Sequence, residues 1–272
     1  MFGQIVGFLN EIAVRIDKAD KFAGLDGTER KTVTKEKEAE KSKENDKSIF
    51  REQKETGANG KLDEVIYQGE YGDCWLLSGI LSMSYTESGS KVIQESITAN
   101  DDGSVDMYFE GIDKSYTITA DEIAKENKPI NSKSMYSRGD DDALAVELGI
   151  EKVVSDPNVE TKYSIQDGGN PYYIYKLYGA EEIGVADDKE EITDAFNYFE
   201  KNSDECSMTL GVVDKRVCGL RKDHAYAVKE VTTSSVVIVD PWNSEEEINV
   251  NKEKLLKESS NLSVVYSKFA TE

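Results

Sequence analysis

The feature that most constrains this chain is the stretch Tyr67–Ser82, which reads YQGEYGDCWLLSGILS. Two glycines and an acidic residue lead to Cys74, and the residues that follow are mostly apolar at helical spacing. This pattern predicts a helix buried on several sides, with Asp73 as its N-cap. In the first turn, the helix dipole and unpaired N–H groups favour a thiolate at Cys74. The alternative is a small apolar cysteine that starts a core helix.

The histidine count favours the reactive thiol. His224 is the only histidine in 272 residues, so any imidazole chemistry must use it. It lies in a strand-like run over 223–228, and a second such run over 235–239 leads directly to Asp240. A hairpin between the two runs would place the Asp240 carboxylate beside the ring. We expect Asp240 to orient the imidazole through its Nδ1–H. A lone histidine with a structural role is the alternative.

Order and spacing point to the same chemistry. A cysteine at a helix start, a histidine about 130–150 residues later and then an amide or acid side chain is the papain-type order of parts. Gln68 lies six residues before Cys74. From that position its side-chain amide can join the Cys74 backbone N–H in binding an oxyanion.

Together these residues resemble the core of the calpain-type cysteine proteases. Three blocks carry the resemblance: QGEYGDCWLLS at 68–78, DHAYAV at 223–228 and DPW at 240–242. The first block is specific by itself. The resemblance extends from about Lys61 to the C-terminus, more weakly through the middle third, and does not include the first 60 or so residues.

Three positions depart from the family pattern. The histidine strand usually reads Gly-His-Ala-Tyr in the family, whereas this chain has Asp223 before the histidine. The family usually has Asn-Pro-Trp-Gly where this chain has Asp240 in place of the asparagine and Asn243 in place of the glycine. An aspartate at the third catalytic position carries a full charge, so it should hold the imidazolium more tightly and raise its pKa.

The expected fold class is α+β. Residues of about 61–165 read as a helical lobe that carries Cys74, and residues of about 166–272 read as a β-rich lobe that carries His224 and Asp240. Residues 61–272 would form one calpain-like protease domain, and the resemblance implies a papain-like two-lobed arrangement with a cleft between the lobes.

Several elements can be placed by pattern. Alternation predicts a hairpin from 104–110 and 115–120, and an amphipathic run predicts a helix near 189–201. A helix capped by Asp141 and Asp142 is expected to end at Gly149. The remaining expected elements are a strand at 207–213, a short helix at 251–258 and a final strand at 262–269.

The N-terminal 1–60 segment has a different character. Apolar residues recur at helical spacing within 1–20, which predicts an amphipathic helix. The mixed-charge stretch 28–60 has little to bury, so we expect a solvated helix or a linker. A regulatory role and self-cleavage within this segment are the functional hypotheses.

Net charge limits the partners. The chain carries a formal charge of −21 at pH 7, which argues against nucleic acids and anionic membrane surfaces. No run approaches the ~18 apolar residues that a membrane span needs, and no export signal is recognisable. We expect a monomer that acts on protein or peptide substrates, including its own N-terminal segment. A cytoplasmic location is the default unless the chain belongs to a larger exported protein.

The three cysteines do not suggest a metal site or a disulfide scaffold. Cys74, Cys206 and Cys218 lack metal-ligand spacing. The last two are expected to be ordinary reduced thiols, and a disulfide between them in a secreted protein is the alternative. The chemistry predicted here requires no cofactor. Calcium is left open, because calpain-type proteins depend on it while no ligand motif in this chain matches.

The predicted reaction is peptide-bond hydrolysis by a Cys-His-Asp triad through a thioester. Two other classes compete with it. A cysteine-dependent acyltransferase or glutamine deamidase can use the same three side chains, and a catalytically silent binding module can keep the fold.

Overall fold

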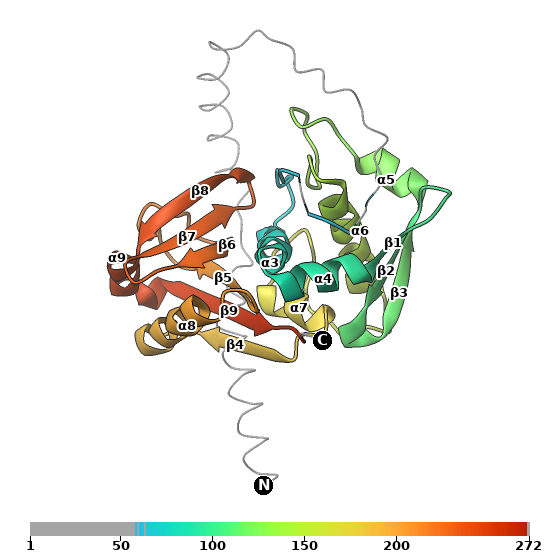
Figure 1. The fold of residues 1–272 in the computed structure, drawn as a ribbon. Helices are drawn as coiled ribbons and strands as arrows, with labels where there is room; N and C mark the ends of the chain where they lie inside the picture. The colour runs from blue at the N-terminus through green and yellow to red at the C-terminus, as the bar shows by residue number, and fades with distance from the viewer. Residues whose placement is uncertain (1–57, 59, 63, 271–272) are drawn as a thin grey trace.

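The computed structural model describes residues 58, 60–62 and 64–270. The amphipathic helix expected within 1–20 and most of the charged stretch 28–60 therefore lie outside the described residues. The described part contains seven α-helices and two antiparallel sheets, which makes the fold α+β (Figure 1). None of its helices has the length and apolar character needed to cross a membrane.

A small three-stranded sheet and five helices form one side of the molecule (Figure 1). The strands, in spatial order, are β1 (Ile97–Ala99), β2 (Val105–Phe109) and β3 (Lys114–Ile118). The helices are α3 (Cys74–Ser84), α4 (Glu87–Ser96), α5 (Ala120–Glu126), α6 (Asp141–Ser155) and α7 (Pro171–Leu177). The predicted hairpin is confirmed as β2 and β3, which a short 3₁₀ turn at Glu110–Ile112 joins.

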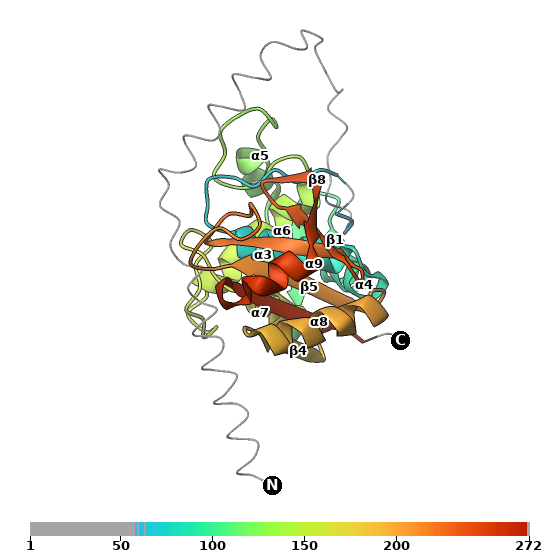
Figure 2. The same cartoon turned by 90° about the vertical axis from the view of Figure 1, so that its left-hand side faces the viewer.

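A six-stranded sheet forms the other side, and Figure 2 shows it with two helices lying across its outer face. Its strands, in spatial order, are β4 (Glu182–Ala186), β9 (Leu262–Lys268), β5 (Cys206–Val212), β6 (His224–Val231), β7 (Ser235–Asp240) and β8 (Asn243–Asn251). The outer helices are α8 (Lys189–Lys201) and α9 (Lys252–Lys257).

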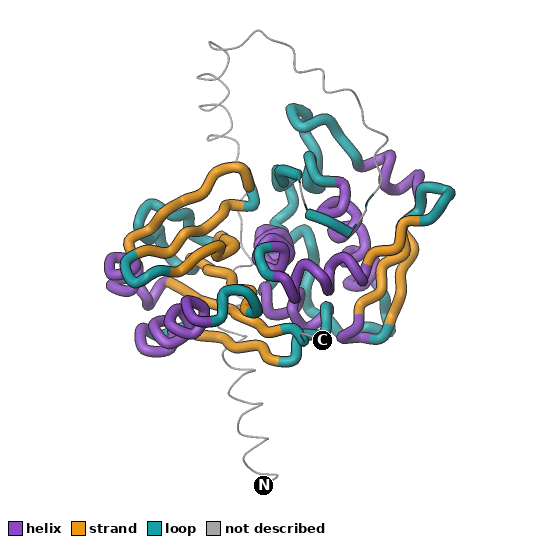
Figure 3. Tube along the Cα trace, viewed as in Figure 1, coloured by secondary structure: helices purple, strands orange, loops and turns teal. Residues whose placement is uncertain are grey.

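Helix α3 lies between the two sides, as the tube in Figure 3 shows. One of its faces packs against β5 and β6, and others contact α4, α6 and α7. Residues 74–83 are all buried, which confirms the prediction of a helix covered on several sides. Gly79 permits the contact with α7, since a Cβ there would lie 3.1 Å from the Ile174 side chain.

The buried apolar side chains form two clusters. The first gathers the residues around α3, including Trp75, Leu76 and Ile80, and extends into α7. The second fills the space between the six-stranded sheet and its outer helices, with Phe196 and Phe199 at its centre. Helix α7 and a few side chains of the large sheet come after residue 165 in the chain but belong to the first cluster. The clusters therefore do not divide the chain at residue 165, and the lobe boundary there stays a prediction.

Helix α6 differs from its prediction in two ways. Its N-cap is Asp140, whose side chain accepts a hydrogen bond from the Ala143 N–H at 2.8 Å. The helix continues through Gly149 to Ser155. Gly149 does not end it because this glycine serves packing, since a Cβ there would lie only 2.5 Å from Met107 Sδ.

The other elements placed by pattern are confirmed as α8, β5, α9 and β9. Strand β8 was not predicted. Its exposed, charged sequence NSEEEINVN lacks the apolar alternation of a half-buried strand, and it forms only through its pairing with β7.

Candidate active site

Cys74 is the first residue of α3 and is buried, with 1% of its surface exposed. The first N–H groups of a helix have no acceptor within the helix, so they are free to bind an anion at this point. Gly69 allows the preceding loop to approach its neighbours closely. A Cβ there would lie 2.1 Å from the Met135 carbonyl oxygen, so only glycine fits.

His224 and Asp240 lie together, as the predicted hairpin requires. His224 begins β6, Asp240 ends β7, and the two strands pair in antiparallel fashion. His224 Nε2 and Asp240 Oδ1 are 2.8 Å apart, and the histidine is 1% exposed. The same Oδ1 accepts a hydrogen bond from the Trp242 backbone N–H at 2.9 Å, which fixes the direction of the carboxylate.

The expectation that Asp240 binds the ring through Nδ1 is wrong, because Nε2 makes this contact. Nδ1 is buried and makes no hydrogen bond to a described residue. The Cys74 thiol lies close enough to the imidazole to interact with it electrostatically. Nδ1 is therefore the nitrogen left to face the sulfur.

The surroundings favour an imidazolium at His224. Burial by itself lowers the pKa of His224, but the Asp240 carboxylate and Cys74 raise it to about 9. Burial raises the pKa of Asp240, yet the His224 imidazolium and the Trp242 N–H bring it below its usual range. The two groups thus stabilise each other's charged form at neutral pH.

Two aromatic side chains enclose the His224 ring. Tyr226 meets it edge-on with 4.8 Å between ring centroids, and Trp242 does so at 5.3 Å. The Arg221 guanidinium covers the Trp242 ring at 4.1 Å from its centroid. Trp242 therefore shields the His224–Asp240 contact, as its position in the sequence suggested, and Tyr226 is both a neighbour of the ring and a core residue.

Gln68 is 5% exposed and is held by neighbouring chain segments. Its backbone N–H donates to the Pro241 carbonyl at 2.9 Å, which ties it to the turn that carries Asp240. Its side-chain Nε2 donates to the Tyr71 carbonyl at 3.0 Å and to Asp73 Oδ1 at 2.8 Å. The opposite amide orientation would turn an oxygen toward two acceptors, so these contacts fix the direction of the amide.

Asp73 occupies the N-cap position of α3, but its side chain makes no capping hydrogen bond. Instead it accepts the Gln68 amide and contacts Glu147 of α6, a residue that the sequence analysis did not select. Both carboxyl groups are fully buried. The sequence signal for Glu147 is an acidic residue inside the apolar run ALAVELGI, where α6 faces the core.

The departures from the family pattern have local explanations. Asp223 has φ of 51°, a left-handed conformation that glycine adopts most easily and that aspartate tolerates. Asn243 is not among the described residues with positive φ, so nothing in its backbone requires glycine. Both substitutions are therefore compatible with the observed backbone.

Trp75 and the two other cysteines belong to the framework. Trp75 is fully buried and packs against Tyr163 and Tyr173, so it forms part of the first cluster. Cys206 and Cys218 are both free thiols, the first buried and the second exposed. Burial raises the pKa of Cys206 to about 12, which keeps it protonated at neutral pH.

The described residues show no side-chain cluster that fits a metal ion. Calcium binds to several oxygen ligands, mostly carboxylates and carbonyls. In the part of the chain that the structure describes, no group of three or more His, Cys, Asp or Glu side chains could hold a metal ion. No step of the chemistry below passes through a metal.

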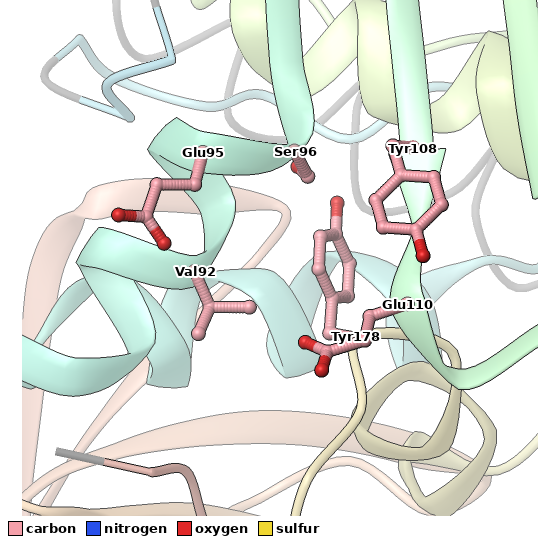
Figure 4. Close-up of a pocket in the computed structure, with 6 residues that line it drawn as sticks. All are labelled: Val92, Glu95, Ser96, Tyr108, Glu110 and Tyr178. Carbon is pink, nitrogen blue, oxygen red and sulfur yellow. The ribbon is translucent and has the colours of Figure 1, made fainter. Parts of the chain in front are cut away.

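A cavity of about 150 Å³ lies apart from these residues (Figure 4). It is lined by Val92, Glu95, Ser96, Tyr108, Glu110 and Tyr178. The Tyr178 hydroxyl points between Ser96 and Tyr108, and the two carboxylates belong to different elements. None of the four candidate site residues contributes to its walls.

Comparison with known families gives one match. A family model described as calpain family cysteine protease matches residues 28–256, which is well over half of the chain. The match begins earlier than the resemblance seen from the motifs, which started near Lys61, and it contains all four candidate site residues. A search among curated proteins finds no match.

Proposed function

Because this chain belongs to the calpain family of cysteine proteases, we propose that it is an endopeptidase with Cys74 as its nucleophile. One observation carries the proposal: the only imidazole in the chain interacts electrostatically with the Cys74 thiol and is hydrogen-bonded to the Asp240 carboxylate. We further propose that the two clusters correspond to the lobes of a papain-like arrangement, with the substrate bound between α3 and the β6–β7 hairpin.

The first chemical step forms a thioester. The Cys74 thiolate attacks the carbonyl carbon of the scissile bond, and the carbonyl oxygen becomes an oxyanion. As the C–N bond breaks, His224 transfers the proton on Nδ1 to the leaving amine. The neutral imidazole that results stays oriented by its Nε2–H bond to Asp240.

The second step releases the acid product. His224 Nδ1 accepts a proton from water, and the resulting hydroxide equivalent attacks the thioester carbonyl. When the C–S bond breaks, the sulfur leaves as a thiolate, and His224 keeps the proton as an imidazolium. This restores the starting ion pair, so the sum of the two steps is hydrolysis of one peptide bond.

Two donors would stabilise the oxyanion. The Cys74 backbone N–H is available because it lies in the first turn of α3. Gln68 Nε2 has two hydrogens, which point to Tyr71 and Asp73. We propose that one hydrogen stays with Asp73 while the other leaves the Tyr71 carbonyl for the oxyanion. Each such donor contributes on the order of 3 kcal/mol.

The test is hydrolysis of casein and of a generic peptide library by the full chain, compared with Cys74→Ala. We expect cleavage by the wild type, including cleavage within residues 1–60, and none by the variant. Assays in excess EDTA and in added calcium measure whether a metal is needed, and we expect activity in both. Ammonia release or amine incorporation without peptide cleavage would replace this proposal with a deamidase or acyltransferase.

Alkylation with iodoacetamide tests the ion pair independently of substrate. The exposed thiol of Cys218 would also react, so the measurement uses a Cys218→Ser background. Rapid alkylation of Cys74 at neutral pH that His224→Ala abolishes supports the pair. A rate equal to that of a free model thiol identifies a catalytically silent module.

A further inference from the structure

Behind the start of α3, two carboxyl groups meet inside the protein. Asp73 precedes Cys74 at the N-cap, and Glu147 projects from α6; neither has any exposed surface. The two side chains lie close enough to interact with each other. Two carboxylates can form a hydrogen bond only with a proton between them, so a direct bond here would need one carboxylic acid.

The donors around the pair are arranged unequally. Glu147 Oε2 accepts hydrogen bonds from the Ser137 N–H, at 2.8 Å, and from the Ser137 hydroxyl. Asp73 Oδ1 accepts the Gln68 amide at 2.8 Å. Glu147 Oε1 has no partner among donors of the described residues, so it is the oxygen that can carry a proton toward Asp73.

Among the described residues, Glu147 has no ion-pair partner. Arg138 is the nearby basic group that interacts electrostatically with Glu147. Its guanidinium is committed to the carbonyls of Ile130, Ser132 and Gln68. Burial, and then the neighbouring charge of Asp73, raise the pKa of Glu147 well above its usual range. Burial, the neighbouring charge and the lack of a donor at Oε1 all favour a proton on Glu147.

We propose that Asp73 and Glu147 share one proton and that this pair positions the Gln68 amide for the reaction at Cys74. Glu147 Oε1–H donates to Asp73, which leaves Asp73 negative and able to hold one Gln68 N–H firmly. The other N–H then has a fixed direction. Glu147 is thus a positioning residue that acts through Gln68, and this role depends on the proposed oxyanion function of Gln68.

The protonation of Glu147 can be measured without any substrate. Infrared spectra of the full chain at neutral pH should show the carbonyl stretch of a protonated carboxylic acid, which is lost in Glu147→Gln. Glutamine keeps the hydrogen bonds, since its Oε1 can accept from Ser137 and its amide can donate to Asp73. Absence of the band, or its persistence in the variant, would overturn the shared proton.

Stability as a function of pH gives a second measurement. A buried group whose pKa is raised on folding stabilises the folded state at low pH, and that contribution is lost as the pH rises. The denaturation midpoint of Glu147→Gln should therefore exceed that of the wild type by an amount that grows from about pH 5 to about pH 8. A constant difference between the two proteins contradicts a neutral Glu147.

Kinetics test the positioning role. Peptide hydrolysis should fall about 10- to 100-fold in Glu147→Ala, whereas Glu147→Gln should recover most of this loss. The alkylation rate of Cys74 should not change in either variant, because alkylation by iodoacetamide develops no carbonyl oxyanion. Glu151→Ala, one turn further along α6 and in contact with Tyr136, is the matched control and should keep its hydrolysis rate.

A double variant decides whether Glu147 acts through Gln68. Gln68→Ala with Glu147→Ala should be no slower than Gln68→Ala alone. Additive losses, or a Glu147→Gln variant as slow as Glu147→Ala, would show that Gln68 is not the route. If Glu147→Ala does not fold, the hydrolysis rate of Glu147→Gln still tests the positioning role, because the proposal expects it to stay close to that of the wild type. A wild type without peptidase activity removes the proposed function, while the infrared and pH measurements still judge the proton pair.

Discussion

Two carboxyl groups near the candidate site have pKa values shifted in opposite directions. Asp240 is bound to an imidazolium and a backbone N–H, and these partners hold its pKa below the usual range although burial opposes them. Glu147 is bound to a serine and another acid, so burial and the charge of Asp73 raise its pKa. Burial raises the pKa of both groups, and the partners decide whether the net shift is upward or downward.

The two carboxyl groups also belong to two sides of the site with different proposed roles. In the proposed mechanism, His224 and Asp240 on the hairpin side control the thiolate and transfer the protons. The start of α3 and Gln68 on the helical side donate hydrogen bonds to the developing oxyanion. Substitutions on the two sides should therefore affect alkylation and hydrolysis differently.

The largest effect should come from His224→Ala. We expect peptide hydrolysis to fall by about 10⁴ or more, because no other imidazole is present to form the ion pair or protonate the amine. Alkylation of Cys74 at neutral pH should fall with it, measured in the Cys218→Ser background. Loss of hydrolysis with normal alkylation would break the assignment of thiolate control to the hairpin side.

Gln68→Ala should cause the second-largest loss of peptide hydrolysis. Removal of one oxyanion donor costs roughly 100-fold or more in kcat. The alkylation rate should stay close to that of the wild type, because the His224–Cys74 contact does not involve the amide. The measurement compares the steady-state rate of peptide hydrolysis with the alkylation rate of Cys74. An equal loss in the two rates would show that Gln68 affects the thiolate as well.

Asp240→Asn should have a smaller effect. The amide oxygen can still accept the Nε2–H of His224, so we expect at least about a tenth of wild-type activity to remain. The imidazolium loses its carboxylate partner, so the pKa of His224 should fall from about 9. The high-pH limit of activity should then move to lower pH by roughly 1–3 units. An unchanged pH profile, or complete inactivity, would require another explanation of the charge on His224.

The imidazolium also contributes to stability. The pKa of His224 rises from 6.5 to about 9 on folding. Its contribution is fully present below about pH 6.5 and is lost as the pH rises through about 9. Denaturant unfolding of the wild type and of Asp240→Asn across this range should show a smaller loss in the variant.

Substitution of Asp223 should have the smallest effect, and the effect should be on stability. At its left-handed φ, Asp223→Val should destabilise the fold by about 1–2 kcal/mol. Asp223→Gly should stay within about 1 kcal/mol of the wild type, since relief of strain offsets the greater freedom of the unfolded chain. Denaturant midpoints measure both. Equal stability of the valine and glycine variants would show that the backbone relaxes at this position.

The local parts of the fold could be predicted from the sequence. Dense apolar residues after Cys74 predict a buried helix, and alternation over 223–228 and 235–239 predicts the hairpin. The pairing of His224 with Asp240 follows from that hairpin, because the two residues are only 16 apart. The helix and the hairpin can be predicted because they depend on periodicity and on short-range contacts.

Other features depend on contacts between distant segments. Strand β8 forms against β7 despite its charged sequence, and α6 passes through Gly149 because Met107 lies against it. Asp240 contacts Nε2 rather than Nδ1 because of the orientation that the His224 ring adopts among its neighbours. None of these is encoded in a local pattern.

The sequence by itself determined which side chains are available: one imidazole, a cysteine at a helix start, and a carboxylate at the end of a nearby strand. The tertiary structure decided what each carboxyl group does. Asp73 binds Gln68 instead of capping α3, because α6 brings Glu147 against it. Charge state depends on the solvent excluded and the partners supplied by remote segments, and folding alone brings those together.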